Sequence, residues 1–128
     1  MDRRLRALSR AVRIIRTQLN HELPIQQLAL LLEVHLNEGI SMPELSKKLN
    51  MGQGSVSKNV KLMSRYIEGG ELRGYDLLST EQDLQERRRF VVHTTEKAQR
   101  LLASITEAAC DVLAGAPEED STTPEVLQ

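Results

Sequence analysis

Hydrophobic residues near the N-terminus recur at intervals of three and four, the period of an amphipathic helix. The stripe consists of Leu5, Leu8, Val12, Ile15 and Leu19. So narrow a seam predicts a helix over residues 3–19 that packs against another helix, from the same chain or from a second copy. Packing on the core of its own domain is the alternative. Six arginines surround the seam, and each can contact a DNA backbone, line a dimer cleft or face solvent.

The next hydrophobic run has a wider apolar face. Pro24 stands at a first-turn position, and the face itself is built from Ile25, Leu28, Leu31, Leu32 and Leu36, extended by Ala29, Leu30 and Val34. This pattern predicts the most buried helix of the chain, followed by Gly39 as its terminator. Ile40, between that glycine and a serine cap, is a candidate for a one- or two-residue strand.

The middle of the chain predicts two short helices joined by a tight turn. Ser41 and Glu44 form a capping box at the start of the first helix, which buries Leu45 and Leu49 and stops at residues 50–52. A 4-3-4 spacing then predicts a second helix, with an apolar side of Val56, Val60, Met63 and Ile67.

The other side of that second helix is polar and carries short side chains. Its residues are Gln53, Ser55, Ser57, Lys58 and Lys61. Small hydroxyls allow close approach to a duplex, an amide can bond base edges, and lysine neutralises phosphate. The pair of helices therefore predicts a helix-turn-helix whose second helix enters a major groove.

Extended structure is favoured after the second helix. Strands are predicted over residues 72–78 and 87–93, with a polar loop over 79–86. A hairpin that follows a helix-turn-helix is a wing, and a wing can place a basic side chain in the minor groove. The basic candidates are Arg73, Arg87, Arg88 and Arg89. On a strand, the middle one of the last three would face away from its neighbours.

A last helix is predicted to start near Thr94, which supplies a hydroxyl cap, and to end at Gly115. Its apolar side consists of Ala98, Leu101, Leu102, Ile105, Ala109, Val112 and Leu113. Beyond it, four acids and two prolines leave little to bury, so a disordered tail is expected. The tail can simply aid solubility or compete with DNA for a basic surface.

Composition agrees with a single helical domain. The chain has 128 residues, and only Tyr66, Tyr75 and Phe90 are aromatic, so the core must be aliphatic. No apolar run is long enough to span a bilayer, no signal peptide is apparent, and one cysteine cannot form an intrachain disulfide. The sequence therefore predicts a cytoplasmic protein without membrane contact.

Charge is distributed unevenly along the chain. All 17 Lys and Arg lie in residues 1–100 beside 12 Asp and Glu, a formal charge of +5, whereas residues 101–128 hold the other 6 acids. A basic body suits a polyanionic partner, although a modest excess is common on surfaces that bind nothing.

Catalytic and metal motifs are not found. No Ser, Cys or Thr lies in a nucleophile motif, and no glycine-rich phosphate loop is present, so we expect no enzyme. The histidines lack metal-site spacing, and neither metal nor cofactor is expected. Cys110 has the acids Glu107 and Asp111 nearby and no base, which favours a packing cysteine over a redox sensor.

The order of these elements, with LPIQQLALLLEVHLNEGISMPELSKKLNMGQGSVSKNVKLM and then ERRRFVVHTTEKAQRLL, resembles the MarR family of winged-helix transcriptional regulators over residues 23–102. That family usually carries Asp-x-Arg in the wing and Leu-Thr-x-x-Gly before the last helix. Here Glu86-Arg87-Arg88 and Thr94-Thr95-Glu96-Lys97-Ala98 stand at those positions. These replacements indicate a distant member.

The resemblance implies a homodimer with interleaved first and last helices, bound to a pseudo-palindromic operator and usually repressing transcription. By family position Ser55, Ser57 and Lys58 would contact double-stranded DNA; helix geometry and the wing add Gln53, Lys61 and Arg88. The dimer contacts are expected from Leu5, Leu8, Val12, Ile15, Leu19, Leu102, Ile105, Ala109 and Val112. Family members often sense a small phenolic ligand or an oxidant, but the sequence identifies no effector here.

We therefore expect a mainly α chain with a small β-hairpin wing, a winged helix-turn-helix with N- and C-terminal dimerisation helices. The expected segments are a basic dimerisation helix (1–22), a DNA-binding domain (23–93), a dimerisation helix (94–114) and an acidic tail (115–128). The expected function is a dimeric, sequence-specific transcriptional repressor. Two alternatives remain: a phage or plasmid DNA-binding protein for replication, partition or DNA coating, and a winged-helix protein-interaction module.

Overall fold

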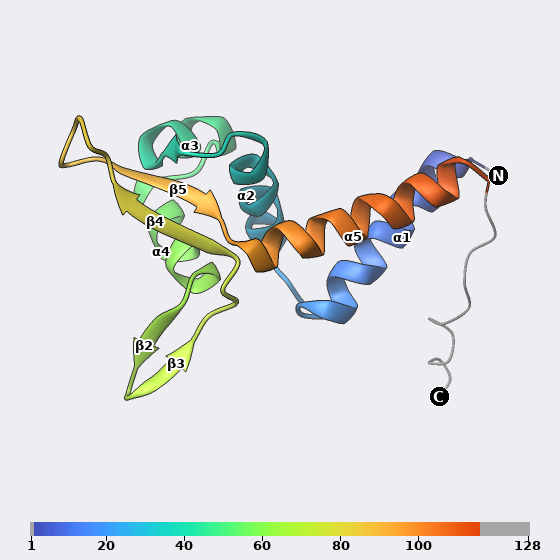
Figure 1. The fold of residues 1–128 in the computed structure, drawn as a ribbon, viewed down its shortest axis with the longest axis horizontal. Coiled ribbons are helices and arrows are strands. Elements are labelled where there is room, and N and C mark those ends of the chain that lie inside the picture. Colours follow the sequence, from blue (N-terminus) through green and yellow to red (C-terminus); the bar gives the residue numbers. More distant parts are fainter. Residues whose placement is uncertain (1, 116–128) are drawn as a thin grey trace. The chain divides into compact units, whose positions relative to one another are not determined.

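A computed structural model describes residues 2–115, which form five helices and five short strands (Figure 1). The chain divides into two compact units. Residues 22–101 form the winged-helix unit, and residues 2–21 with 102–115 form the arm. Most of the predicted acidic tail lies outside the described residues. None of the helices within residues 2–115 is long and apolar enough to cross a bilayer.

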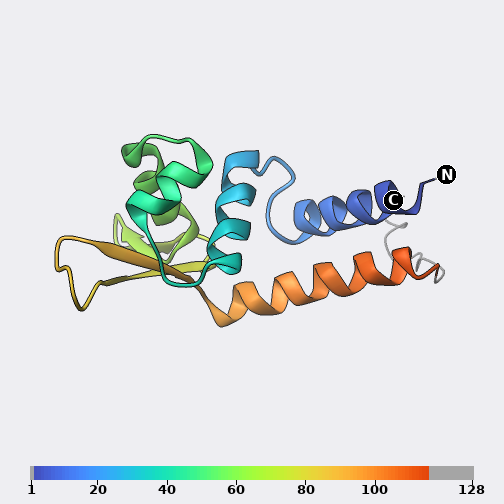
Figure 2. The same cartoon turned by 90° about the horizontal axis from the view of Figure 1, so that it is seen from above.

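The winged-helix unit contains three helices and a three-stranded antiparallel sheet (Figures 1 and 2). The helices are α2 (Ile25–Leu36), α3 (Met42–Leu49) and α4 (Gln53–Met63). The strands lie in the order β1 (Ile40–Ser41), β5 (Phe90–Thr94) and β4 (Leu78–Gln82). Ile40 pairs with Val92, which confirms the short strand predicted before the helix-turn-helix.

Aliphatic side chains fill the core of this unit, as the shortage of aromatic residues predicts. Those exposed by 2% or less are Leu30, Leu31, Val34, Leu45, Val56, Val60, Met63, Leu77, Leu78, Val92 and Ala98. They come from the three helices, from the sheet and the residue before β4, and from the start of the last helix. Burial of so many apolar side chains in one cluster supplies most of the stabilisation of the unit.

The ends of α3 match the predicted signals. The Ser41 hydroxyl accepts a hydrogen bond from the backbone N–H of Glu44 at 3.3 Å and donates one to its carboxylate at 3.2 Å. At the other end Asn50 adopts the left-handed conformation with φ of 52°. A short asparagine tolerates that region better than most residues, so the helix stops and the chain turns toward α4.

The buried side of α2 differs from the predicted one. Ile25, Leu32 and Leu36 were expected in the core, but they are 78%, 41% and 73% exposed. Their spacing places them on one side of the helix, and the core instead receives the side with Leu30 and Val34. The prediction is wrong for these three residues and right for Leu31, which is 1% exposed. The reason is that α2 is apolar almost all round, and periodicity then cannot tell which side meets the core.

The segment after α4 also departs from the prediction. α4 ends at Met63, and Ile67 lies in an extra hairpin, β2 (Tyr66–Glu68) and β3 (Glu71–Arg73), instead of extending the helix. Gly69 and Gly70 both have positive φ, as a two-residue hairpin turn requires. The predicted strand over 72–78 is therefore split, and β4 begins only at Leu78.

A tight contact at Gly74 closes the base of this hairpin. Gly74 has φ of 96°, and a Cβ on it would lie 1.7 Å from the carbonyl oxygen of Ser64. We predict that Gly74→Ala destabilises the protein by about 3 kcal/mol or more, because it combines a left-handed backbone with a backbone clash. Gly70→Ala has only the conformational penalty, since its Cβ meets nothing within 4 Å, and should cost about 1 kcal/mol. Urea unfolding measures the loss of unfolding free energy in both variants. Equal losses would contradict the tight contact between Gly74 and Ser64.

In the arm, α1 (Arg3–Gln18) lies beside the C-terminal part of α5 (Glu96–Leu113) in both views (Figures 1 and 2). This confirms the helix predicted over 3–19. The buried residues of the arm are Ala7 and Ile15 from α1 with Leu102, Ile105 and Val112 from α5.

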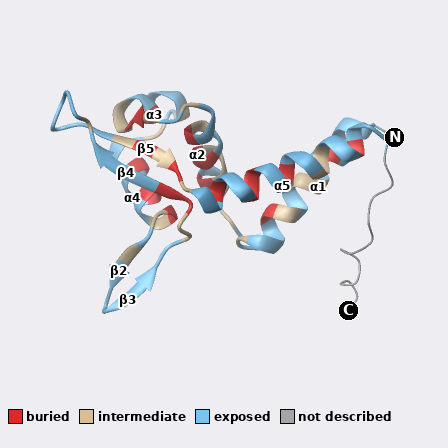
Figure 3. Ribbon diagram, viewed as in Figure 1, coloured by how far each residue is buried: buried red, intermediate tan, exposed pale blue. Residues whose placement is uncertain are grey.

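Much of the predicted seam of α1 lies on the side that stays uncovered. Leu5, Leu8 and Val12 are 64%, 60% and 40% exposed, whereas Ile15 is buried and Leu19 is half-buried. Figure 3 shows both buried and exposed positions along α1. Periodicity located the stripe correctly, but α5 covers a neighbouring side of the helix.

Candidate nucleic-acid interface

The polar side of α4 is exposed along its whole length. Gln53, Ser55, Ser57, Lys58 and Lys61 are all exposed. The opposite side carries Val56, Asn59, Val60 and Met63, which are buried. The structure thus brings the five residues predicted on this helix to one surface.

Polar and apolar contacts fix α4 on the rest of the unit. The side-chain amide of Gln27 on α2 donates a buried hydrogen bond to the Asn59 carbonyl oxygen at 3.1 Å. Asn59 in turn donates to the backbone oxygen of Ser55 at 2.9 Å. Sequence reasoning missed this pair because an amide within an apolar helix gives no periodic signal. The bond restricts rotation of α4, so its exposed side keeps a fixed orientation within the unit.

The first turn of α4 is open to an approaching anion. Gly52 is its N-cap and provides no side-chain hydrogen bond. A Cβ placed on Gly52 or Gly54 would meet nothing within 4 Å, so no side chain covers the backbone there. Free N–H groups at a helix N-terminus, together with the helix dipole, are suited to binding a phosphate.

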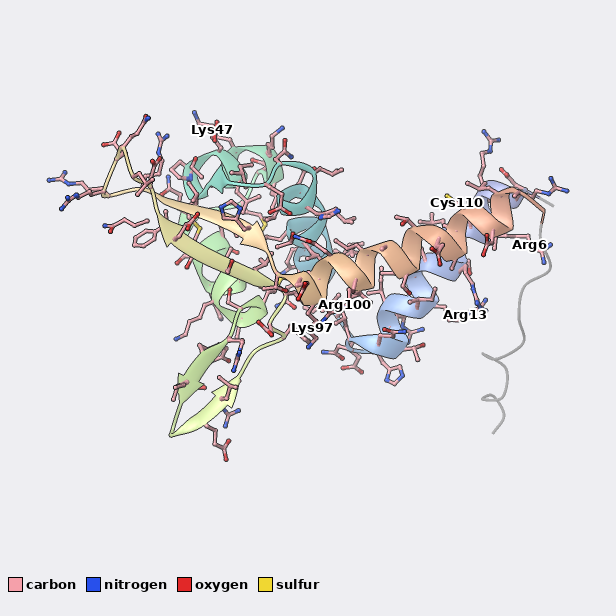
Figure 4. All side chains as sticks on the ribbon, in the orientation of Figure 1. Arg6, Arg13, Lys47, Lys97, Arg100 and Cys110 are labelled. Atoms are coloured by element: carbon pink, nitrogen blue, oxygen red, sulfur yellow. The ribbon has the colours of Figure 1, made fainter. Side chains whose placement is uncertain are left out.

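Cations on this surface have few acidic partners. Lys58 forms no ion pair among the described residues, and the Lys61 ammonium lies 5.1 Å from the centre of the Tyr66 ring. Tyr66 belongs to the unpredicted hairpin, so its position here could not be foreseen. Lys47 (Figure 4) and Lys48 are exposed at the end of α3.

The wing places its three consecutive arginines in a loop. Arg87, Arg88 and Arg89 were predicted on a strand with alternating faces, but β5 begins only at Phe90. Hydrogen bonds shape the loop: the Gln82 amide donates to the Arg87 oxygen at 2.7 Å, and the Asp83 N–H donates to the Arg89 oxygen at 2.8 Å. The strand prediction failed because the strand propensity of Phe90, Val91 and Val92 dominates the local sequence pattern. The hydrogen bonds that shape the loop join residues several positions apart, and they leave no local signal.

Exposed arginines of the winged-helix unit are not equivalent. The three wing arginines form no ion pair with any described residue. Arg73 lies on β3, outside the wing, and its guanidinium is 3.7 Å from the Glu68 carboxylate and 3.1 Å from that of Glu71. Arg88 therefore differs from Arg73 in having no ion-pair partner among residues 2–115.

A carboxylate anchors the root of the wing. Glu38 accepts a hydrogen bond from the Thr94 backbone N–H at 2.9 Å and another from its hydroxyl. His93 lies between Glu38 and Glu81, with ring nitrogens 3.5 Å and 3.1 Å from their carboxylates. These residues connect the end of α2 to β4 and β5. No group of His, Cys, Asp or Glu side chains within residues 2–115 is arranged to hold a metal ion.

Comparison with known proteins finds similar folds among solved structures. No family model and no curated sequence matches the chain. Among solved structures, the crystal structure of MarR is 25% identical, with a TM-score of 0.55, and the match covers 86% of this chain and 69% of that one. FabT of Streptococcus pneumoniae, solved in complex with DNA, is 15% identical, with a TM-score of 0.59 and coverage of 87% and 73%. PcaV of Streptomyces coelicolor, solved with its natural ligand, is 17% identical, with a TM-score of 0.54 and coverage of 96% and 82%.

PcaV is named a transcriptional regulator. The residues that carried the sequence resemblance fall on α2, α3, α4, β5 and the start of α5. The chain therefore has a MarR-like winged-helix fold.

Proposed function

We propose that the protein is a homodimeric, sequence-specific DNA-binding transcriptional regulator that represses by occupying a pseudo-palindromic operator. The observation that carries the proposal is the exposed polar side of α4, opposite its buried apolar side, on which Lys58 has no acidic partner within residues 2–115. Likeness to MarR and to a DNA-bound FabT supports it.

In this proposal α4 enters the major groove. Gln53, Ser55 and Ser57 bond base edges and nearby phosphates, because their short side chains allow the helix to approach closely. Lys58 and Lys61 neutralise phosphates. The wing follows the backbone, and Arg88 reaches the adjacent minor groove.

The exposed stripe on α1 supports dimerisation. Leu5, Leu8 and Val12 lie on one side of α1 and are uncovered in the protomer. Contiguous exposed apolar residues typically mark an interaction site. In the proposed dimer this stripe meets the partner's arm, with Leu19 and Ala109 at its margins. Ile15, Leu102, Ile105 and Val112 are buried inside the protomer and hold the two helices of the arm together.

Selection of bound sequences from a random duplex pool, combined with the mass of the protein in solution, tests the proposal. A dimer that selects a two-fold symmetric motif is the expected result. Binding without sequence preference, with an affinity that depends only on salt, would favour a DNA-coating or partition protein. Failure to bind any duplex would favour a protein-interaction module.

The wing contact gives a separate prediction. Arg88→Ala should weaken binding to the selected duplex and reduce the slope of log affinity against log salt by about 1, because one phosphate-neutralising cation is lost. Arg73→Ala removes the same charge from a side chain already paired with Glu68 and Glu71, and should leave the slope unchanged. Fluorescence anisotropy at several salt concentrations measures both. Equal slopes for Arg88→Ala and the parent would exclude the wing contact.

A further inference from the structure

A pocket inside the arm is lined by two arginines, Arg10 and Arg13, whose side chains form no ion pair with any described residue. It lies between α1 and α5 and has a volume of about 280 Å³. Its lining includes Arg10, Arg13, Ile14, Gln18, Ser104 and Ala108. This volume is close to the lower limit of ligand pockets, about 300 Å³, so the pocket suits a small molecule.

One guanidinium nitrogen in the pocket is buried without a hydrogen bond. Nη1 of Arg10 is inaccessible to solvent and has no hydrogen-bond partner among the described residues. Buried polar atoms in folded proteins are nearly always paired, and each exception needs an explanation. The requirement is stronger for a charged donor, because its desolvation is costly unless an anion or acceptor compensates.

The remaining polar groups of the pocket are also donors. The Arg13 guanidinium, the Gln18 amide and the Ser104 hydroxyl form no side-chain hydrogen bond or ion pair among the described residues. Figure 4 shows Arg13 on α1. The Thr17 hydroxyl is also in the lining, but it already donates a hydrogen bond to the Arg13 backbone oxygen at 2.7 Å.

The charged side chains that line the pocket are all positive. No acidic residue occurs in its lining, so Arg10 and Arg13 bring two positive charges together. Other arginines of the same helix are satisfied: Arg4 bonds Asp2 at 3.3 Å, and Arg16 donates to the His21 oxygen at 3.0 Å. Two unpaired guanidinium groups would be neutralised by a ligand of two negative charges.

We propose that the arm pocket binds a small dianion, either a phosphate monoester or a short dicarboxylate. Guanidinium groups bind the oxygen pairs of carboxylate and phosphate in a bidentate manner. The Ser104 hydroxyl and Gln18 amide supply further donors, and Ile14 and Ala108 accommodate a short carbon skeleton. The site is confined to the arm, and binding to it requires no DNA.

Thermal unfolding and calorimetry of the full chain with inorganic phosphate and with succinate test this site. At constant ionic strength, each effective probe should raise the midpoint of unfolding saturably, whereas sodium chloride and acetate should not. The stronger of the two probes identifies the ligand class. Arg10→Gln should abolish the shift, and Arg13→Gln should weaken binding on the order of tenfold.

Arg4→Gln is the matched control, since it removes the same charge from the same helix outside the pocket, and it should bind the probes as the parent does. Without any probe, Arg10→Gln should be at least as stable as the parent, because a buried guanidinium nitrogen without a hydrogen bond is removed. A merely structural arginine would instead lower the unfolding midpoint. The proposal is overturned if neither probe binds, or if Arg4→Gln weakens binding as much as Arg10→Gln. It is also overturned if Arg10→Gln and Arg13→Gln affect only self-association, because a partner's carboxylate would then be the occupant.

Discussion

Leu8→Glu is expected to convert the proposed dimer into a monomer and to weaken binding to the selected duplex by more than about 100-fold. Leu8 is 60% exposed in the protomer, at the centre of the uncovered stripe on α1. A carboxylate there would have to be desolvated in the dimer, without a partner, whereas it is harmless in the monomer. A monomer has only one α4. The second half-site is then no longer bound by a helix held nearby at high effective concentration, so affinity for the whole operator falls. Sedimentation velocity and anisotropy measure the two effects.

Ile67→Glu provides the matched control. Ile67 is 74% exposed on the β2–β3 hairpin, so the same change of chemistry occurs at a similarly accessible site outside the arm. This variant should remain a dimer. If Leu8→Glu is also a dimer, the stripe on α1 is not the interface.

The second large effect is expected from the double variant Ser57→Ala with Lys58→Ala. Both residues are exposed on α4, while Val56, Asn59 and Val60 behind them are buried, so the helix itself should not be disturbed. Affinity for the selected duplex should fall about 10- to 100-fold, because a base-edge or phosphate hydroxyl contact and a phosphate-neutralising cation are both lost. The unfolding free energy should change little.

Arg100→Ala is the control for charge. Arg100 lies on α5, and its guanidinium is 3.4 Å from the Glu96 carboxylate (Figure 4). Its substitution removes one positive charge and leaves α4 unchanged. It should bind DNA as the parent does. A similar loss of affinity in Arg100→Ala and the double variant would mean that net charge, and not the surface of α4, governs binding.

The helix-turn-helix could be predicted from the sequence because its signals are local. Ser41, Glu44 and the break at residues 50–52 determine helix ends through bonds to nearby backbone groups. The 4-3-4 spacing of Val56, Val60 and Met63 then gives the orientation of α4, since an amphipathic helix has only one side to bury. The candidate DNA-contacting residues on α4 follow from that orientation.

Features that depend on distant contacts could not be predicted. Gly69 and Gly70 indicated the end of a helix, but the hairpin around them is also anchored by Gly74 on Ser64. The covered side of α1 depends on α5, which is far away in sequence. The arm pocket arises from the same pairing, so no sequence pattern distinguishes Arg10 and Arg13 from the other arginines of α1.

The central claim is that two copies of α4 face outward together, about one turn of duplex apart. The distance between spin labels at Ser57→Cys, in a Cys110→Ser background, tests it in the free dimer. A distribution centred at about 34–36 Å is expected, because this spacing brings the two helices into successive major grooves on one side of a duplex. A monomer without any inter-label distance, or labels so close that the two α4 surfaces pack on each other, would contradict the account.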